Sequence, residues 1–225
     1  TVPLAKYVAL HYNELSFPFR RYQIGKVYRG ERAQRGRFRE FYQADIDIIG
    51  HGTLDMTNEA EIPSIIYQTL STLGLKRFQI RVNNRKILNG FYAMLGLTEK
   101  SADVMRTVDK LDKIGADGVK KELLEKEFDA AAVEALDEFL RAGDFSLDAV
   151  TARVGDETLT ADLRYVIATA EKIANGRYGI AYAPSLVRGQ GYYTGMVFEV
   201  TCPQFSGAVA GGGRYDNMVG KFIGQ

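Results

Sequence analysis

The spacing of apolar residues changes twice along the chain, and these changes restrict the folds that the chain can adopt. Between about residues 20 and 49 the apolar residues alternate with period two, as in two strands joined by a loop over residues 30–36. From about residue 98 to residue 176 they recur at helical spacing, and from residue 178 the alternation returns. We therefore predict an α+β fold in which an antiparallel sheet with flanking helices is interrupted by a helical insertion subdomain.

This pattern divides the chain into three segments. We expect residues 1–97 to form the first part of a sheet domain, residues 98–178 the helical insertion, and residues 179–225 the second part of the sheet domain. A helix is predicted from Thr57 to a stop at Gly74, followed by a strand over residues 78–82. Residues 192–201 are rich in aromatic and β-branched side chains, which predicts a further strand.

The composition excludes several classes of protein. The formal net charge is +1, so any surface that binds nucleic acid must be local. A single cysteine and two histidines offer neither an internal disulfide nor the ligand spacing of a zinc site. No apolar run is long enough to span a bilayer and no secretory leader is seen, so we expect no membrane partner and a cytoplasmic location. Because no initiator Met is present, we expect a trimmed piece of a longer protein.

The two predicted strands before residue 50 carry polar groups with two possible interpretations. Eight basic residues lie between Arg20 and Arg39, where the acidic counter-charge is Glu31. Such a loop suits phosphate recognition, but a solvated hairpin tip has the same composition. On the following strand the polar residues fall on one face, together with one aromatic ring: Phe41, Gln43, Asp45 and Asp47. This face is either open to water or the floor of a ligand site.

Glycines surround two further groups of polar residues. The segment 188–195 reads Arg-Gly-Gln-Gly-Tyr-Tyr-Thr-Gly, and residues 211–216 read Gly-Gly-Gly-Arg-Tyr-Asp. Glycine permits close approach of the backbone to a ligand, although a bulged strand entry is the alternative. Neither segment is a nucleotide P-loop, because the Gly-x-x-x-x-Gly-Lys-Ser/Thr pattern is absent.

The combination of these segments is more specific than any one of them. Residues 28–32 (Tyr-Arg-Gly-Glu-Arg) with residues 36–43 (Gly-Arg-Phe-Arg-Glu-Phe-Tyr-Gln) resemble motif 2 of class II aminoacyl-tRNA synthetases. Arg188-Gly189 followed by residues 192–195 resembles the histidine-specific signature of the histidyl-tRNA synthetases, and residues 212–216 match the same family. The resemblance covers nearly the whole chain. It implies a class II synthetase-like fold. It also implies an enzyme that uses ATP with Mg²⁺ to join L-histidine to tRNA(His) and that is a homodimer when the protein is full length.

The resemblance also implies which residues bind ATP. Arg29 would hold the α-phosphate and the histidine carboxylate, and Arg37 would reach the outer phosphates. Glu31 would accept from the adenine amino group, and Phe41 would stack on the adenine ring. Glu199 is the candidate ligand for the Mg²⁺ that accompanies the nucleotide.

A second set of residues is expected to bind histidine. The resemblance places the following side chains around the amino acid: Thr1, Arg29, Gln43, Asp47, Arg188, Tyr192, Tyr193 and Tyr215. Asp47 would accept from one ring nitrogen of neutral imidazole and Tyr193 would donate to the other. Arg29 and Arg188 are the candidate catalytic residues, because the attacking carboxylate and the α-phosphate are both anionic.

The chain departs from the family pattern in ways that leave a second hypothesis open. Gln190 and Gly191 stand where the signature usually has Leu-Asp, which removes a carboxylate beside the pocket. Motif 1, the motif 3 arginine and the anticodon-binding domain are expected outside this chain, so the chain alone is expected to be inactive. A non-catalytic sensor or regulatory domain of the same fold, such as the regulatory subunit of ATP phosphoribosyltransferase or a starvation-sensing kinase, is the alternative. A sheet domain whose arginines are only structural is a third interpretation.

Overall fold

The computed structural model describes residues 1–30, 32, 38–98, 101–143, 146–186 and 191–224. Its elements follow along the chain in this order: α1 (Val2–Leu10), β1 (Phe19–Tyr28), β2 (Glu40–Ile49), α2 (Thr57–Thr72), β3 (Gln79–Asn84), α3 (Arg85–Met94), α4 (Ser101–Val108), α5 (Leu111–Glu125), α6 (Ala130–Ala142), α7 (Leu147–Val154), α8 (Thr158–Ala174), β4 (Ile180–Tyr182), β5 (Met196–Cys202), β6 (Phe205–Gly213) and α9 (Asn217–Ile223). The predicted hairpin and the predicted helix from Thr57 are confirmed.

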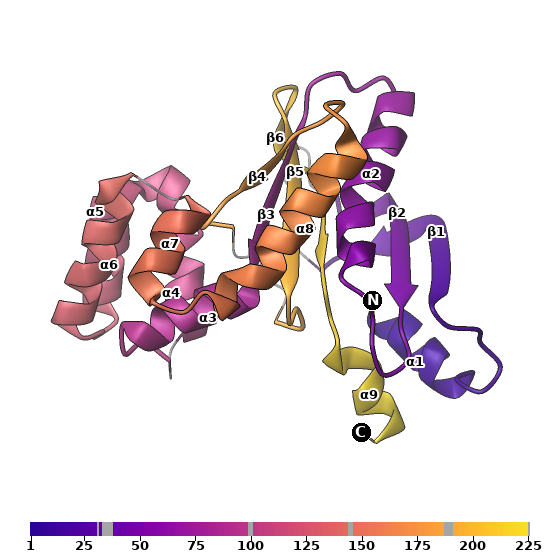
Figure 1. Cartoon of the computed structure of the whole chain (residues 1–225), viewed down its shortest axis with the longest axis horizontal. Helices are drawn as coiled ribbons and strands as arrows, with labels where there is room; N and C mark the ends of the chain where they lie inside the picture. Colours follow the sequence, from indigo (N-terminus) through magenta and orange to yellow (C-terminus); the bar gives the residue numbers. More distant parts are fainter. Residues whose placement is uncertain (31, 33–37, 99–100, 144–145, 187–190, 225) are drawn as a thin grey trace.

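A four-stranded sheet with the order β4-β3-β5-β6 lies at the centre of the molecule (Figure 1). Helices α2 and α8 pack against each other beside this sheet. Their buried residues, among them Ile66 and Val166, share one hydrophobic core with Ile80 and Val200 of the strands. Burial of such side chains is the main favourable contribution to folding of this part of the chain.

The α+β fold is confirmed, with one parallel strand pair in an otherwise antiparallel sheet. β3 pairs antiparallel with β5, and β5 pairs antiparallel with β6, whereas β4 runs parallel to β3. Parallel neighbours need a crossover connection of about a dozen residues or more, because the chain must return to the same end of the sheet. The helices from α3 to α8 provide that crossover here.

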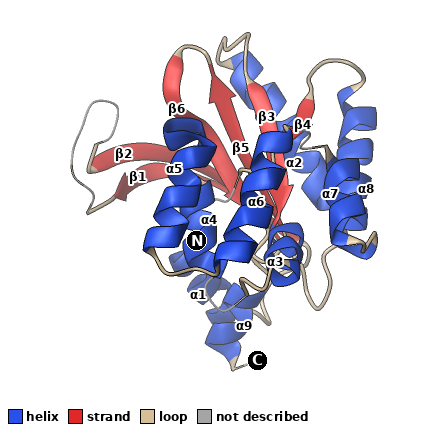
Figure 2. Cartoon of the chain, turned by 90° about the vertical axis from the view of Figure 1, so that its left-hand side faces the viewer, coloured by secondary structure: helices blue, strands red, loops and turns tan. Residues whose placement is uncertain are grey.

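The helices between β3 and β4 pack against different parts of the chain. α5 packs against α4 and α6, and these helices form the layer that faces the viewer in Figure 2. α8, the last helix of the predicted insertion, instead packs along α2. The division of the chain at residues 97/98 and 178/179 stays a prediction. No helix in the described part of the chain combines the length and the apolar character needed to cross a membrane.

The β1–β2 hairpin forms a separate two-stranded sheet with one polar and one apolar face. Its cross-strand pairs place polar residues on one face, such as Arg21 opposite Asp47, and apolar residues on the other, such as Tyr22 opposite Ile46. The apolar face is the open one, with Tyr22 78% exposed and Tyr42 70% exposed. Along β2 the polar-face residues are less exposed than their neighbours. The hairpin therefore directs its polar side chains toward the rest of the chain.

A cluster of charged residues connects α4 to α5 and gives the helical layer a dependence on pH. Glu122 accepts bonds from Lys110 Nζ and Lys126 Nζ, each at 2.7 Å, and Lys126 Nζ also donates to Thr107 Oγ1 at 2.8 Å. These bonds lower the pKa of Glu122 to about 2. Because the folded pKa lies below the unfolded value, this stabilisation is complete above the unfolded pKa and is lost as the pH falls toward the folded one.

We predict that Glu122→Gln lowers the free energy of unfolding at pH 7, and that the difference from the wild type shrinks as the pH is lowered from about 4.5 toward 2. Urea denaturation followed by circular dichroism at several pH values measures both effects. Glu125→Gln is the control, because Glu125 lies on the same helix and meets Lys121 only at 3.9 Å with both side chains exposed. A difference that stays constant between pH 7 and pH 3 would contradict the prediction.

Candidate active site

The polar face of the β1–β2 hairpin is held by contacts within and between its strands. Arg21 Nη2 lies 2.7 Å from Asp47 Oδ2, and Arg21 Nη1 donates to Gln23 Oε1 at 2.7 Å. On β2, Gln43 Nε2 donates to Asp45 Oδ1 at 2.6 Å. The polar residues predicted to form a ligand floor therefore fall into two bonded groups on one face, one around Asp47 and one around Gln43. Arg21 lies at one end of this face, where the register places it directly opposite Asp47.

Asp47 also receives a hydrogen bond from a residue far away in the sequence. The Tyr215 hydroxyl donates to Asp47 Oδ1 at 2.6 Å. Burial and the neighbouring Asp47 carboxylate raise the pKa of Tyr215, so its hydroxyl keeps its proton and remains a donor. The side chain of Asp47 is 11% exposed. A carboxylate offers about four acceptor positions, so Asp47 retains capacity for a further donor from a ligand.

Two more tyrosines lie beside this pair. The ring centroids of Tyr192 and Tyr193 are 4.7 Å apart, and those of Tyr192 and Tyr215 are 6.2 Å apart in an edge-on arrangement. The hydroxyls of Tyr192 and Thr1 are 3.4 Å apart. The structure thus brings together Thr1, Asp47 and the three tyrosines, which the sequence placed in one histidine site.

The glycines that end β6 make room for the aromatic side chains of this cluster. A Cβ atom on Gly213 would lie 2.8 Å from Tyr193 Cδ1 and 2.7 Å from the Met196 carbonyl oxygen. A Cβ atom on Gly212 would lie 2.8 Å from the ring of Phe198. All three distances are shorter than van der Waals contact, so a larger residue at either position would displace its neighbours. In the described residues the glycine run therefore serves close packing beside the site.

Arg29 and Phe41 form the other end of the polar face. Arg29 Cζ lies 4.8 Å from the centroid of the Phe41 ring, and its Nη2 is 3.4 Å from Gln43 Oε1. The guanidinium therefore rests on the aromatic face by a cation–π contact. Arg29, Phe41 and Gln43 lie next to one another as predicted, and Gln43 connects them to Asp45 in the direction of Asp47.

The remaining predicted residues are three members of the substrate sites and one metal ligand. Glu31, Arg37 and Arg188 lie outside the described residues. Glu199 lies on β5 opposite Arg81 and Gly211. The described residues contain no group of three or more metal-binding side chains. Magnesium bound with a nucleotide commonly takes only one or two protein carboxylates, so a half-buried Glu199 fits that role and the assignment stays a prediction.

Sequence reasoning did not assign two residues that support the site. The sequence places Arg21 among the basic residues of the hairpin, whereas the strand register pairs it with Asp47. Asn83 is fully buried on β3, and its Nδ2 donates to the carbonyl oxygens of Pro184 and Leu186 at 3.1 and 3.0 Å. It thereby fixes the segment that precedes the predicted histidine signature. Nothing in the local sequence around Asn83 signals contacts with residues a hundred positions away.

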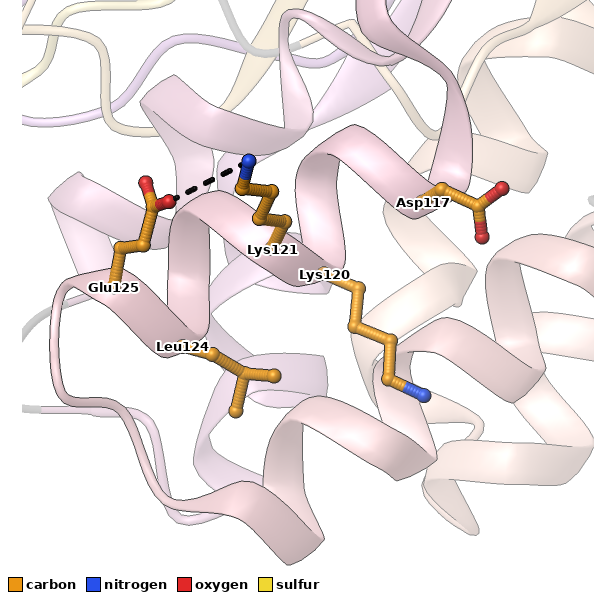
Figure 3. Close-up of a pocket in the computed structure, with 5 residues that line it drawn as sticks. All are labelled: Asp117, Lys120, Lys121, Leu124 and Glu125. Atoms are coloured by element: carbon orange, nitrogen blue, oxygen red, sulfur yellow. Dashed lines mark ion pairs between the residues drawn. The ribbon is translucent and has the colours of Figure 1, made fainter.

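A hollow on the surface of α5 is separate from this site (Figure 3). It is lined by Asp117, Lys120, Lys121, Leu124 and Glu125. Lys120 is paired with Glu134 of α6 at 2.6 Å, and Lys121 faces Glu125. Its charged groups are thus already engaged, and α5 lies on the opposite side of the sheet from the β1–β2 hairpin (Figure 1).

Comparison with known proteins agrees with this arrangement. The family model described as "Histidyl-tRNA synthetase" matches residues 1–225. The chain is 42% identical over 238 residues to a histidine–tRNA ligase of Clostridium tetani, with 100% of this chain and 53% of the relative covered. It is 43% identical over 233 residues to a histidine–tRNA ligase of Thermobifida fusca, with 99% of this chain and 52% of the relative covered. The chain spans about half the length of these relatives.

Solved structures show the same relationship. The crystal structure of a histidyl-tRNA synthetase from Nostoc sp. PCC 7120 superposes with a TM-score of 0.87 at 34% identity, covering 100% of this chain and 54% of that one. An ATP phosphoribosyltransferase regulatory subunit/histidyl-tRNA synthetase from Bacillus halodurans C shares the fold with a TM-score of 0.77 at 22% identity, over 98% of this chain and 57% of that one. With a family model matched along its whole length, the chain belongs to the histidyl-tRNA synthetase family.

Proposed function

We propose that the full-length protein carrying this chain is a histidine–tRNA ligase. It activates L-histidine with ATP to give histidyl-adenylate and pyrophosphate, and then transfers the histidyl group to the terminal ribose of tRNA(His). The observation that supports this proposal most is the position of Asp47. Its carboxylate lies on a covered polar face and is held by Arg21 and by Tyr215, whose ring lies beside that of Tyr192.

The proposed recognition of histidine follows from the donors and acceptors of the imidazole ring. Neutral imidazole has one N–H donor and one acceptor nitrogen. Asp47 accepts from the donor, and the Tyr193 hydroxyl donates to the acceptor. Arg21 and Tyr215 hold the carboxylate in one orientation, so little ordering remains when the ligand binds. An amino acid without ring nitrogens would leave these groups unpaired, which can discriminate by about 10⁴ or more.

The proposed activation step joins two anionic groups. A histidine carboxylate oxygen attacks the α-phosphorus of ATP, an oxygen–phosphorus bond forms, and the bond to the departing pyrophosphate breaks. Arg29 and Arg188 stabilise the charge on the α-phosphate and the carboxylate, and Arg37 holds the outer phosphates. Glu31 and Phe41 bind adenine. Mg²⁺ with Glu199 as a ligand would neutralise phosphate charge when the nucleotide is bound.

Adenine binding in this proposal requires a movement of Arg29. Its guanidinium rests on the ring of Phe41, the surface assigned to adenine. A cation–π contact at an exposed site contributes about 0.5–1 kcal/mol. Hydrogen bonds between arginine and a phosphate are about twice as strong as neutral ones. Release of Arg29 from Phe41 to the α-phosphate is therefore favourable and frees the ring for stacking.

The proposed partners are tRNA(His) and a second copy of the protein. The exposed apolar face of the β1–β2 hairpin supports an assembly, since Tyr22, Ile24 and Tyr28 are each at least 70% exposed in this chain. Exposed apolar side chains gathered on one face are typical of a protein contact. We further propose that the helical layer touches tRNA rather than histidine or ATP, and that the protein acts in the cytoplasm.

Histidine-dependent ATP–pyrophosphate exchange by the full-length protein tests the proposed function. We expect exchange with L-histidine and little with other amino acids, followed by charging of tRNA(His). Binding of histidine without exchange would instead support the regulatory alternative, whose fold is similar. The presence of Arg29, Glu31, Arg37 and Arg188 favours the enzyme, because a sensor of histidine needs no such set of phosphate-binding residues.

We predict that Asp47→Ala raises the KM for histidine by about 10- to 100-fold, because loss of one charge-assisted hydrogen bond costs about 1.5–3 kcal/mol. The KM for ATP should change little. Steady-state pyrophosphate exchange measures both constants. Glu40→Gln is the matched control: it lies on the same strand and pairs with Lys26 in an exposed position. Unchanged histidine affinity in Asp47→Ala would refute the assignment.

For Arg188→Ala we predict a fall in kcat for pyrophosphate exchange of about 10² or more, since a preorganised cation acts where charge develops in the transition state. The KM for ATP should move less. Transfer of histidine from a pre-formed adenylate to tRNA should be comparatively unaffected. Single-turnover kinetics separate these steps. Normal activation with weak substrate binding would make Arg188 a binding residue only.

A further inference from the structure

The side chain of Arg214 contacts three segments of the chain that are separate in sequence. Its Nη1 lies 2.7 Å from Glu59 Oε1 on α2, and its Nη2 donates to the Leu54 carbonyl oxygen at 3.2 Å. Its Nε donates to Asp216 Oδ1 at 2.6 Å. One planar guanidinium thus holds the segment before α2, the first turn of α2 and the start of α9 in a fixed relation. A planar fork of donors can do this, whereas a single ammonium cannot.

The contact with Glu59 is largely covered from solvent. The side chains of Arg214 and Glu59 are 21% and 12% exposed. Burial raises the pKa of Glu59, while Arg214 acts in the opposite direction by hydrogen bonding and by charge. An ion pair in such surroundings is costly to break from one side, because the remaining charge is left without its partner.

The backbone of Arg214 is also fixed. Its N–H donates to the Met196 carbonyl oxygen at 2.8 Å, and its own carbonyl accepts from the Thr194 N–H at 2.8 Å. The side chain of Arg214 lies against Gly195, where a Cβ atom would be 3.0 Å from Arg214 Cδ. Both the backbone and the side chain of Arg214 are therefore held directly before Tyr215.

We propose that Arg214 is a positioning residue that holds Tyr215 in place for its hydrogen bond to Asp47, through the contacts of Arg214 with Glu59, Leu54 and Asp216. Tyr215 follows Arg214 immediately, and its hydroxyl reaches Asp47 on the opposite side of the site. The ion pair with α2 thereby sets the orientation of the carboxylate that faces the imidazole. This inference rests on the proposed function, since it concerns the affinity for histidine.

The test is a double-mutant cycle in the full-length protein, with the KM for histidine in pyrophosphate exchange as the readout. Arg214→Lys keeps the charge but loses the fork, and we expect a rise of about tenfold in the KM for histidine with the KM for ATP within about twofold. Tyr215→Phe removes the hydroxyl alone. In the Tyr215→Phe background, Arg214→Lys should raise the KM for histidine less than about threefold, because residue 215 then has no hydroxyl to hold against Asp47.

Two further variants separate positioning from folding. Arg20→Lys is the matched control: Arg20 donates to Glu61 and Asn58 of the same helix at 2.9 and 2.8 Å but does not precede Tyr215, so the KM for histidine should stay unchanged. Glu59→Gln weakens one anchor and leaves the guanidinium in place. If Arg214→Lys does not fold, Glu59→Gln provides the same cycle, with a rise of about threefold that disappears in the Tyr215→Phe background.

The outcomes distinguish this inference from the proposed function. A rise of the same size in both backgrounds, or no rise in an active protein, would overturn the positioning role of Arg214. If the wild type shows no exchange but binds histidine in calorimetry, the proposed function fails, and the same cycle is measured on the dissociation constant. A wild type that neither exchanges nor binds histidine would overturn both.

Discussion

The carboxylate of Asp47 joins three parts of the chain that are distant in sequence. It pairs with Arg21 on the neighbouring strand, accepts from Tyr215 in the segment before α9, and lies on β2 beside Gln43 and Asp45. A charged pair this well covered is costly unless each group finds several partners. Arg21 contacts Gln23 as well as Asp47, while its Nε is buried without a hydrogen-bond partner among the described residues. The geometry of the site depends on this polar cluster.

The inward direction of these polar groups explains the exposure of the hairpin. Side chains alternate along a strand, so turning one face toward the site turns the other away from it. The apolar residues Tyr22, Ile24 and Tyr42 are consequently open in this chain. Hairpins on a protein surface commonly turn their apolar face toward the core and their polar face toward water. Specificity for a polar ligand and an apolar contact surface are thus two consequences of one register, fixed by pairs such as Arg21 with Asp47.

Local sequence patterns predicted the helices and strands better than they predicted the contacts between distant residues. The alternation over residues 40–49 is a local property, and it identified both β2 and its polar face. Which face is covered depends on Tyr215 and other distant residues, so no local pattern could decide between a ligand floor and a face open to water. The same holds for the contacts of Asn83 with Pro184 and Leu186. The family resemblance supplied the grouping of Thr1 with the tyrosines, which periodicity alone did not contain.

A crystal structure of the full-length protein with L-histidine bound tests the proposed role of Asp47 most directly. We expect one imidazole nitrogen to lie about 2.6–3.2 Å from a carboxylate oxygen of Asp47, with the contacts from Arg21 and Tyr215 still in place. The other ring nitrogen should meet the Tyr193 hydroxyl. An imidazole bound elsewhere, with Asp47 engaged only by Arg21 and Tyr215, would show that Asp47 does not recognise histidine.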